Sequence, residues 1–267
     1  MNIQGLVLRQ IFRFLSIKGI SNIISKISIV KAGYQSQEIV NSVVLKNIHF
    51  REQIGTLEFS SENLKIITAL EICMKGKKDK THFRVLDFGG GGGHAYWVAK
   101  RYFPQIKFDW NVIETQELSE LAQRKLGNHE LKFHCELRKF LSKDNFFDLV
   151  FSNSGIQYTD NPMATLNLLL ELDSNNVFIT RTPLSLDEEP FEYFQYSLGS
   201  ENGPITGLKI KNFLATYKCT AIPKNLAIQS FSRKSVQIEV KNEGVWDFKK
   251  GKVGSFTVIG RRDPEND

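Results

Sequence analysis

Five consecutive glycines, residues 89–93, follow an apolar run that carries Asp87 near its end, and they lead into a helical stretch. Glycine is needed where a backbone turns sharply and must approach a ligand with no Cβ in the way. A merely flexible loop is the plain alternative, but ordering five glycines costs so much chain entropy that few such loops are built this way. The pattern therefore predicts a loop that cradles a nucleotide-like ligand.

Three nucleotide-binding patterns compete for this loop. A P-loop is excluded, because His94-Ala95 stands where that motif has Lys followed by Ser or Thr. A dinucleotide fingerprint, G-x-G-x-x-G/A, can be drawn through the run with Ala95 as its last residue. The pattern acid-x-G-x-G-x-G is met in full, by Asp87, Gly89, Gly91 and Gly93.

A second acid supports the same interpretation. Glu114 directly follows the apolar run 108–113, as Asp87 ends the run before the glycines. A carboxylate at the end of the second strand of a nucleotide-binding fold can accept hydrogen bonds from both ribose hydroxyls. Glycine loop and acid together are more specific than either alone, although they leave a dinucleotide open.

These residues must be positioned by an alternation of short apolar runs and helical stretches. The runs are 83–87, 108–113, 131–135, 147–152 and 177–180, and the helical stretches are 94–103, 116–126 and 161–172. Strand and helix in regular alternation predict an α/β fold with parallel strands and helices on both faces. Such a sheet binds its ligand at the carboxyl ends of its strands. The tail predicts antiparallel strands over 217–222, 228–240 and 255–261.

The first eighty residues show a different pattern of apolar residues. Apolar residues at helical spacing predict two amphipathic helices in the first thirty residues, and further helical patterns cover 34–75. The Lys- and Gly-rich stretch 75–80 indicates a solvated linker, so we expect an accessory region over residues 1–80. The first two helices either dock on the rest of the protein or lie on an anionic membrane surface through residues 1–30.

The composition limits which binding partners and which cellular compartment we expect for this protein. Residues 1–50 hold six basic side chains and one acid, which accounts for most of the net charge of +6. The rest of the chain is nearly neutral, so we expect no basic groove that binds nucleic acid. The three cysteines form no C-x-x-C pair, which argues against disulfides and against a metal site. No apolar run reaches the length of a membrane-spanning helix. A reducing, cytoplasmic compartment fits best, at the inner face of the membrane if the first helices bind there.

Asp87 and the glycine loop resemble motif I of the class I S-adenosylmethionine-dependent methyltransferases. The resemblance implies a Rossmann-like domain over residues 81–267, with a mostly parallel seven-stranded sheet that has an antiparallel edge. It also implies that the loop passes under the methionine and ribose parts of S-adenosylmethionine, while Asp87 helps to bind the amino group. By position, Glu136 falls where the family contacts adenine, and the segment 152–158 faces the transferred methyl. The expected cofactor residues are Asp87, Gly89, Gly90, Gly91, Gly93, Glu114, Glu136, Ser152 and Asn153.

A narrower resemblance covers most of the chain. Segments 31–34, 85–93, 110–114, 131–133, 157–162 and 181–183 resemble a bacterial family of mostly uncharacterised methyltransferases associated with surface-polysaccharide gene clusters. This resemblance implies a substrate area and does not assign the acceptor. Our interpretation is an enzyme that O-methylates a small-molecule or saccharide acceptor, with a saccharide or a lipid-linked saccharide preferred. Two alternatives remain open at this point: a nucleotide-sugar oxidoreductase that uses NAD(P), and a non-catalytic protein that binds the cofactor as a scaffold.

Methyl transfer to a hydroxyl needs a group that takes the proton. The candidates by position are His94, Tyr158 and Asp160. Arg181 could bind an anionic acceptor through its planar guanidinium, or form an ion pair with an acid of 187–189. The stretch 184–207 is expected to cover the acceptor pocket.

Overall fold

The computed structural model describes residues 29–30, 33–56, 60–75, 80–142, 145–185, 188–199, 202–204, 206–210, 213–233, 241–248 and 251–261. The two amphipathic helices expected in the first thirty residues lie almost wholly outside this set, as do residues 76–79 of the expected linker. Both expectations stay predictions. None of the helices in the described ranges is long and apolar enough to cross a membrane.

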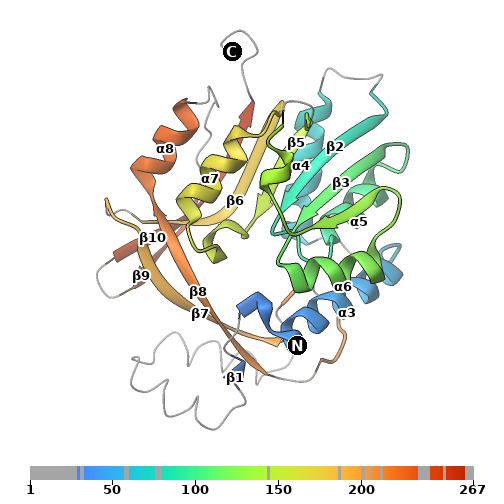
Figure 1. Ribbon diagram of the computed structural model, residues 1–267, viewed down its shortest axis with the longest axis horizontal. Helices are drawn as coiled ribbons and strands as arrows, with labels where there is room; N and C mark the ends of the chain where they lie inside the picture. The colour runs from blue at the N-terminus through green and yellow to red at the C-terminus, as the bar shows by residue number, and fades with distance from the viewer. Residues whose placement is uncertain are drawn as a thin grey trace.

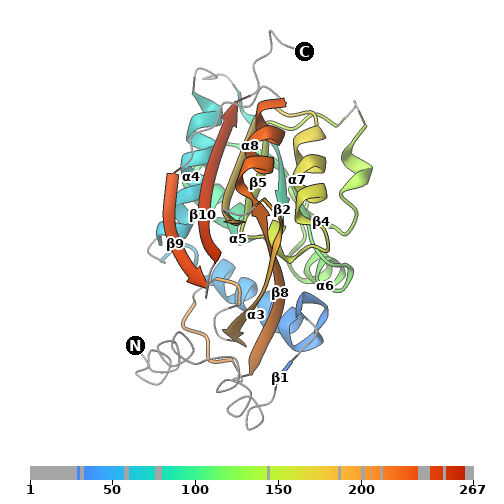
Figure 2. The same ribbon diagram turned by 90° about the vertical axis from the view of Figure 1, so that its left-hand side faces the viewer.

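The centre of the molecule is a sheet whose main run of strands is β4–β3–β2–β5–β6–β10–β9 (Figure 1). Neighbours are parallel except at β10, which is antiparallel to both β6 and β9, and Figure 2 shows this pair at one edge. The predicted α/β fold, with a mostly parallel seven-stranded sheet and an antiparallel edge, is confirmed. The strands are β2 (His82–Phe88), β3 (Lys107–Ile113), β4 (Leu131–His134), β5 (Leu149–Asn153), β6 (Asn176–Ser185), β9 (Lys241–Phe248) and β10 (Gly251–Arg261).

Successive side chains of the central strands enter two different hydrophobic clusters, because side chains alternate between the faces of a strand. Val85 and Leu149 belong to one cluster, while their neighbours Leu86 and Val150 belong to the other. The first cluster includes residues of α5 (His94–Tyr102) and α6 (Gln116–Leu126), and the second includes residues of α7 (Pro162–Glu171) and α8 (Lys224–Arg233). Helices therefore cover both faces, and the predicted stretches 94–103, 116–126 and 161–172 match α5, α6 and α7 closely.

The strand predicted over 228–240 is wrong in its first part. Residues 228–233 belong to the helix α8, and residues 234–240 lie outside the described ranges. Ala227, Ser230 and Phe231 are the buried residues of α8, at the i, i+3, i+4 spacing of a helix face. This face packs beside α7 and β8, so tertiary packing fixes the helix where the short pattern was ambiguous.

A smaller layer extends from the carboxyl end of β6. The long strand β8 (Leu214–Pro223) pairs in parallel with the last two residues of β6 and antiparallel along all of β7 (Phe191–Leu198). The short strand β1 (Ile29–Val30) pairs with the start of β8. Figure 1 shows β7 and β8 running together past the end of the central sheet toward β1 and α3.

The region before residue 80 contributes to the same core as the sheet. The helices α3 (Gln37–Gln53) and α4 (Ser61–Met74) confirm helical structure within 34–75. Val43, Phe50 and Leu70 from these helices share one hydrophobic cluster with strand residues such as Val85. The division of the chain at residue 80 stays a prediction, but the described part of the accessory region packs directly on the rest of the protein.

Candidate active site

A cavity with a volume of about 2120 Å³ opens at the carboxyl ends of β2, β3, β4 and β5 and reaches Arg181 of β6. Its walls come from the glycine loop, from the residues after these strands, from η1 (Gly33–Gln35) and α3, and from β7, β8 and the segment between them. A pocket for one drug-sized ligand measures about 300–1,000 Å³. The cavity is therefore large enough for two ligands side by side, as a group transfer requires.

The buried side chain of Asp87 lies directly against Gly90 of the glycine loop. Its side chain is 1% exposed, and its Oδ2 accepts a hydrogen bond of 3.1 Å from the indole Nε1 of Trp110. A Cβ on Gly90 would lie 2.5 Å from the Asp87 carboxylate, so the loop can pass over this acid only as glycine. Burial raises the pKa of Asp87 to about 7; the bond from Trp110 opposes this rise, and the charge of Glu114 adds to it.

The turn after β2 depends on Gly89. Its φ is +70°, a conformation that glycine adopts without strain, and its N–H donates to the carbonyl of Ile113 over 2.9 Å. A Cβ on Gly89 would lie 2.6 Å from the Cα of Gly155, so two backbone segments touch here. The loop is thereby fixed to the ends of both β3 and β5. Gly93, with φ +79°, then forms the N-cap of α5.

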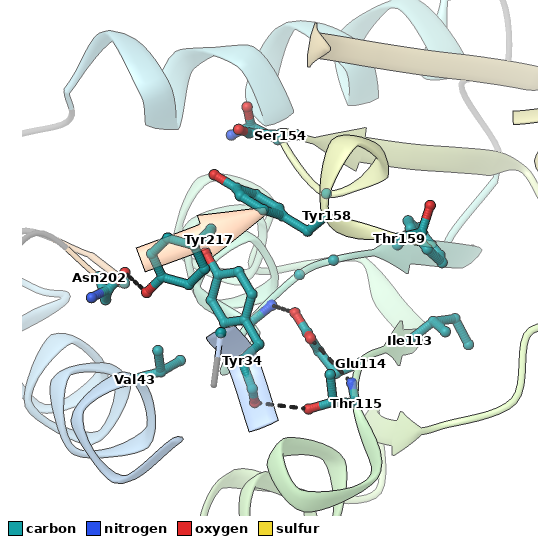
Figure 3. Close-up of a pocket in the computed structure, with 18 of the residues that line it drawn as sticks. Tyr34, Val43, Ile113, Glu114, Thr115, Ser154, Tyr158, Thr159, Asn202 and Tyr217 are labelled. Carbon is teal, nitrogen blue, oxygen red and sulfur yellow. Dashed lines mark hydrogen bonds between the residues drawn. The ribbon is translucent and has the colours of Figure 1, made fainter. Parts of the chain in front are cut away.

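Glu114 holds the loop from the cavity side. Its Oε1 accepts a 2.7 Å hydrogen bond from the backbone N–H of Gly91, and its Oε2 accepts one of 3.3 Å from Thr115 (Figure 3). Burial raises the pKa of Glu114 to about 7, and these two backbone bonds oppose the rise. Within the described part of the chain, no basic side chain forms an ion pair with Asp87 or Glu114. Of these two acids, Glu114 therefore lies in the cavity wall and Asp87 is buried behind the loop, and neither has a counter-charge among the described residues.

Most of the residues selected from the sequence meet in this one cavity. They are Gly89, Gly90, Gly91, Glu114, Glu136 and Asn153 for the cofactor, and His94, Tyr158, Asp160 and Arg181 for the acceptor.

Three of the expected cofactor residues do not line the cavity: Asp87, Gly93 and Ser152. Asp87 lies under Gly90, and a Cβ on Gly93 would lie 3.1 Å from the side chain of Leu131. The buried Ser152 donates from its hydroxyl to the carbonyl of Phe88 over 3.0 Å. In these positions the three residues support the loop from outside the cavity, and their contact with the cofactor stays a prediction.

Arg181 reaches the cavity through an irregularity of β6. Thr180 pairs with Thr257 of β10 and Thr182 pairs with Phe256, so Arg181 is an extra residue, a β-bulge, between two buried threonines. Its φ is +57°, which is strained for a residue with a Cβ. Bulges next to active sites commonly redirect a side chain. Ser154, at the end of the neighbouring β5, also has a positive φ of 64°, so strain is concentrated at this rim.

A wall of three tyrosines crosses the cavity, and the sequence predicted only one of them. The rings of Tyr34, Tyr158 and Tyr217 have centroids 4.8–5.5 Å apart, and Figure 3 shows them gathered between Glu114 and Asn202. Tyr34 belongs to a segment that carried the narrower resemblance, whereas nothing in the local pattern singled out Tyr217. Burial raises the pKa of Tyr158, so this phenol is protonated at neutral pH and is a poor base.

The side of the cavity formed by β7 and β8 is polar and mostly neutral. Tyr158 donates to Gln195 over 3.0 Å, and Tyr217 donates to Asn202 over 2.7 Å. Ser197 also donates to Asn202, over 3.3 Å. We expected the stretch 184–207 to cover the acceptor pocket, and part of it covers this side of the cavity. It lines the cavity with Gln195, Ser197, Asn202, Gly203, Pro204, Thr206 and Gly207.

Two amide oxygens on the cavity wall have no hydrogen-bond partner among the described residues. They are Oδ1 of Asn47, on α3, and Oδ1 of Asn153, at the end of β5. With the carboxylate of Glu114, they make the surroundings of the glycine loop rich in acceptors. No group of three or more His, Cys, Asp or Glu side chains in the described ranges could hold a metal ion. The chemistry of this wall suits a ligand that donates hydrogen bonds or carries positive charge.

No family model matches the chain, and no curated protein sequence matches it. Among solved structures, an S-adenosylmethionine-bound amino pentose methyltransferase from Micromonospora echinaspora is 14% identical, with 76% of this chain and 92% of that chain covered and a TM-score of 0.49. An S-adenosylmethionine-dependent methyltransferase from Clostridium acetobutylicum is 12% identical, with 82% and 97% covered and a TM-score of 0.48. A sugar N-methyltransferase from a Streptoalloteichus species is 14% identical, with 80% and 91% covered and a TM-score of 0.46. These are similarities of overall shape.

Proposed function

We propose that this protein is an S-adenosylmethionine-dependent methyltransferase that O-methylates a saccharide or a lipid-linked saccharide. The observation that carries the proposal is the Glu114 carboxylate, which holds the glycine loop through Gly91 at the edge of a cavity large enough for cofactor and acceptor together.

The hydrogen-bonding groups around the loop fit S-adenosylmethionine better than a dinucleotide. A diphosphate needs N–H donors from the loop, but the Gly91 amide already donates to Glu114. Acceptors such as Asn47 Oδ1, Asn153 Oδ1 and the Glu114 carboxylate instead suit ribose hydroxyls, an ammonium group and a positively charged sulfonium. The strand order agrees, because a dinucleotide-binding sheet has six parallel strands, whereas β10 is inserted antiparallel between β6 and β9 here.

The acceptor side of the cavity fits a sugar. Hydroxyl and amide side chains such as Ser197, Asn202 and Gln195 can both donate and accept hydrogen bonds, as sugar hydroxyls do. The tyrosine wall provides apolar ring faces beside them. This combination supports a saccharide acceptor over an apolar one.

The bound cofactor supplies an electrophilic methyl group, and the protein aligns an acceptor oxygen with it and removes the hydroxyl proton. Of the four candidate residues, Tyr158 is protonated and already donates to Gln195, and Arg181 cannot act as a base. His94 and Asp160 remain as proton acceptors, since both line the cavity.

A binding and a transfer experiment test the proposal in sequence. Thermal shift with S-adenosylmethionine, S-adenosylhomocysteine, NAD and NADP should show stabilisation by the first two only. Tritiated methyl transfer into saccharide precursors from the native host should then label an alkali-stable ether. Stabilisation by NAD or NADP would favour the oxidoreductase, and binding without transfer to any precursor would favour a scaffold.

Arg181→Lys should lower turnover about tenfold while leaving S-adenosylhomocysteine affinity unchanged. We infer that the bulge directs the Arg181 guanidinium to an anionic group of the acceptor, where the point charge of lysine cannot replace a planar pair of N–H donors. Steady-state kinetics and calorimetric titration measure the two effects. Arg124→Lys, on the exposed side of α6, is the matched control. Unchanged turnover with a lowered melting temperature would show that Arg181 serves a structural ion pair.

Contact of residues 1–30 with the inner face of the membrane also remains part of the proposal. The full chain should co-sediment with anionic vesicles and be released above about 0.5 M salt, because screening is then nearly complete. Removal of residues 1–28 leaves β1 in place and should abolish sedimentation. Equal sedimentation of the truncated chain, or equal binding to uncharged vesicles, would contradict the membrane interpretation.

A further inference from the structure

Asn47 leaves one oxygen unpaired at the glycine loop. The residue lies on α3 and is 1% exposed, and its Nδ2 donates to the carbonyl of Val43 over 2.8 Å. A carbonyl can only accept, so this bond fixes the orientation of the amide and directs Oδ1 away from Val43. In the part of the chain that the structure describes, Oδ1 has no hydrogen-bond partner, although the residue lines the cavity. A Cβ on Gly92 would lie 2.5 Å from Asn47 Cγ, so the amide lies directly against the loop.

A buried oxygen without a partner is unfavourable, and native structures contain few of them. A ligand that donates a hydrogen bond at this point would remove the penalty. The donors of S-adenosylmethionine are the two ribose hydroxyls, the adenine amino group and the ammonium group of its methionine part. Glu114, at the end of β3, is the acceptor suited to the ribose. Glu136, which follows β4 and lines the cavity, is the residue expected at the adenine. With the ribose and the adenine assigned in this way, the ammonium group is the donor left for the amide beside Gly92.

We propose that Asn47 Oδ1 accepts a hydrogen bond from the ammonium group of the cofactor, which makes α3 part of the cofactor site. The inference rests on the proposed function. The sequence assigned this contact to Asp87, but that acid lies beneath Gly90, accepts from Trp110 and does not line the cavity. Asn47 lies on the cavity side of the same loop. The region before residue 80 then supplies a group that the α/β domain lacks at this point.

The test compares two ligands on two proteins. The ligands are S-adenosylhomocysteine and its analogue in which hydrogen replaces the amino group, and calorimetric titration measures both. The unsubstituted protein should prefer S-adenosylhomocysteine by about 10- to 100-fold, which is the range of one hydrogen bond to a charged group. Asn47→Leu should weaken the binding of S-adenosylhomocysteine about tenfold or more and change the affinity for the analogue less than about threefold. The difference between these two effects isolates the contact between Asn47 and the amino group.

Asn41→Leu is the matched control, because Asn41 is an exposed asparagine on the same helix and does not line the cavity. It should leave both affinities unchanged. Asn47→Ala removes the same oxygen in a smaller side chain and replaces Asn47→Leu if that variant fails to fold. Equal weakening of both ligands by the Asn47 variants would overturn the inference while the proposed function stands. Failure of the unsubstituted protein to bind S-adenosylhomocysteine at all would instead overturn the proposed function, and the inference with it.

Discussion

Glu114→Ala is expected to weaken S-adenosylhomocysteine binding by roughly 30- to 150-fold while the domain stays folded. One carboxylate can accept from both ribose hydroxyls, and hydrogen bonds to a charged group contribute about 1.5–3 kcal/mol each. Competition with water reduces the total to about 2–3 kcal/mol, which corresponds to that range of dissociation constants. The structure adds a second cause, because the variant also releases the Gly91 amide and loosens the loop.

Calorimetric titration measures this effect, and circular dichroism checks the fold. Glu117→Ala is the matched control, because Glu117 is an exposed glutamate in the first turn of α6, three residues along the chain. Its dissociation constant should equal that of the unsubstituted protein. If Glu114→Ala also left the dissociation constant unchanged, Glu114 would support the loop without contacting the ribose, and the cofactor assignment would lose its main observation.

Gly89→Ala is expected to lower the melting temperature by about 10 °C. A residue with a Cβ is strained at φ +70°, by about 1–2 kcal/mol, and crowding in a packed site adds about 1–3 kcal/mol. The crowding is severe here because the added Cβ would meet the Cα of Gly155 at 2.6 Å, and backbone cannot turn aside as a side chain can. At about 2–4 °C per kcal/mol for a chain of this size, the sum gives the expected shift.

Gly207→Ala separates the two causes. Gly207 has the same φ of +70°, but a Cβ there would meet nothing within 4 Å. Its variant should therefore show the strain alone, a fall of about 3 °C in the melting temperature. Differential scanning calorimetry on both variants makes the comparison. Equal shifts would mean that the contact between the β2 and β5 turns yields easily, and that the loop is less tightly fixed than the packing indicates.

The sequence predicts those parts of the candidate site whose functional residues lie within one short local pattern. The glycine loop and Glu114 each directly follow an apolar run, and parallel strands bring the ends of such runs to one edge of the sheet. Their meeting in one cavity therefore required only the correct fold class. Asp87 was predicted to bind the cofactor, and this stays a prediction. Its burial beneath Gly90 depends on the path of the loop in space, which residue spacing does not contain.

The α/β alternation, the glycine loop and the acids beside it could be predicted from the amino-acid sequence, because periodicity and glycine content act over a few neighbouring residues. The distant side chains that complete the cavity could be identified only from the packing of the elements in space. Tyr34, Asn47 and Tyr217 lie on three separate elements, and packing of α3 and β8 against the sheet brings them together. Arg181 enters the cavity because β10 pairs with β6 out of register at that residue. Such contacts depend on how distant helices and strands pack against one another. The local sequence pattern of a single element does not contain that information.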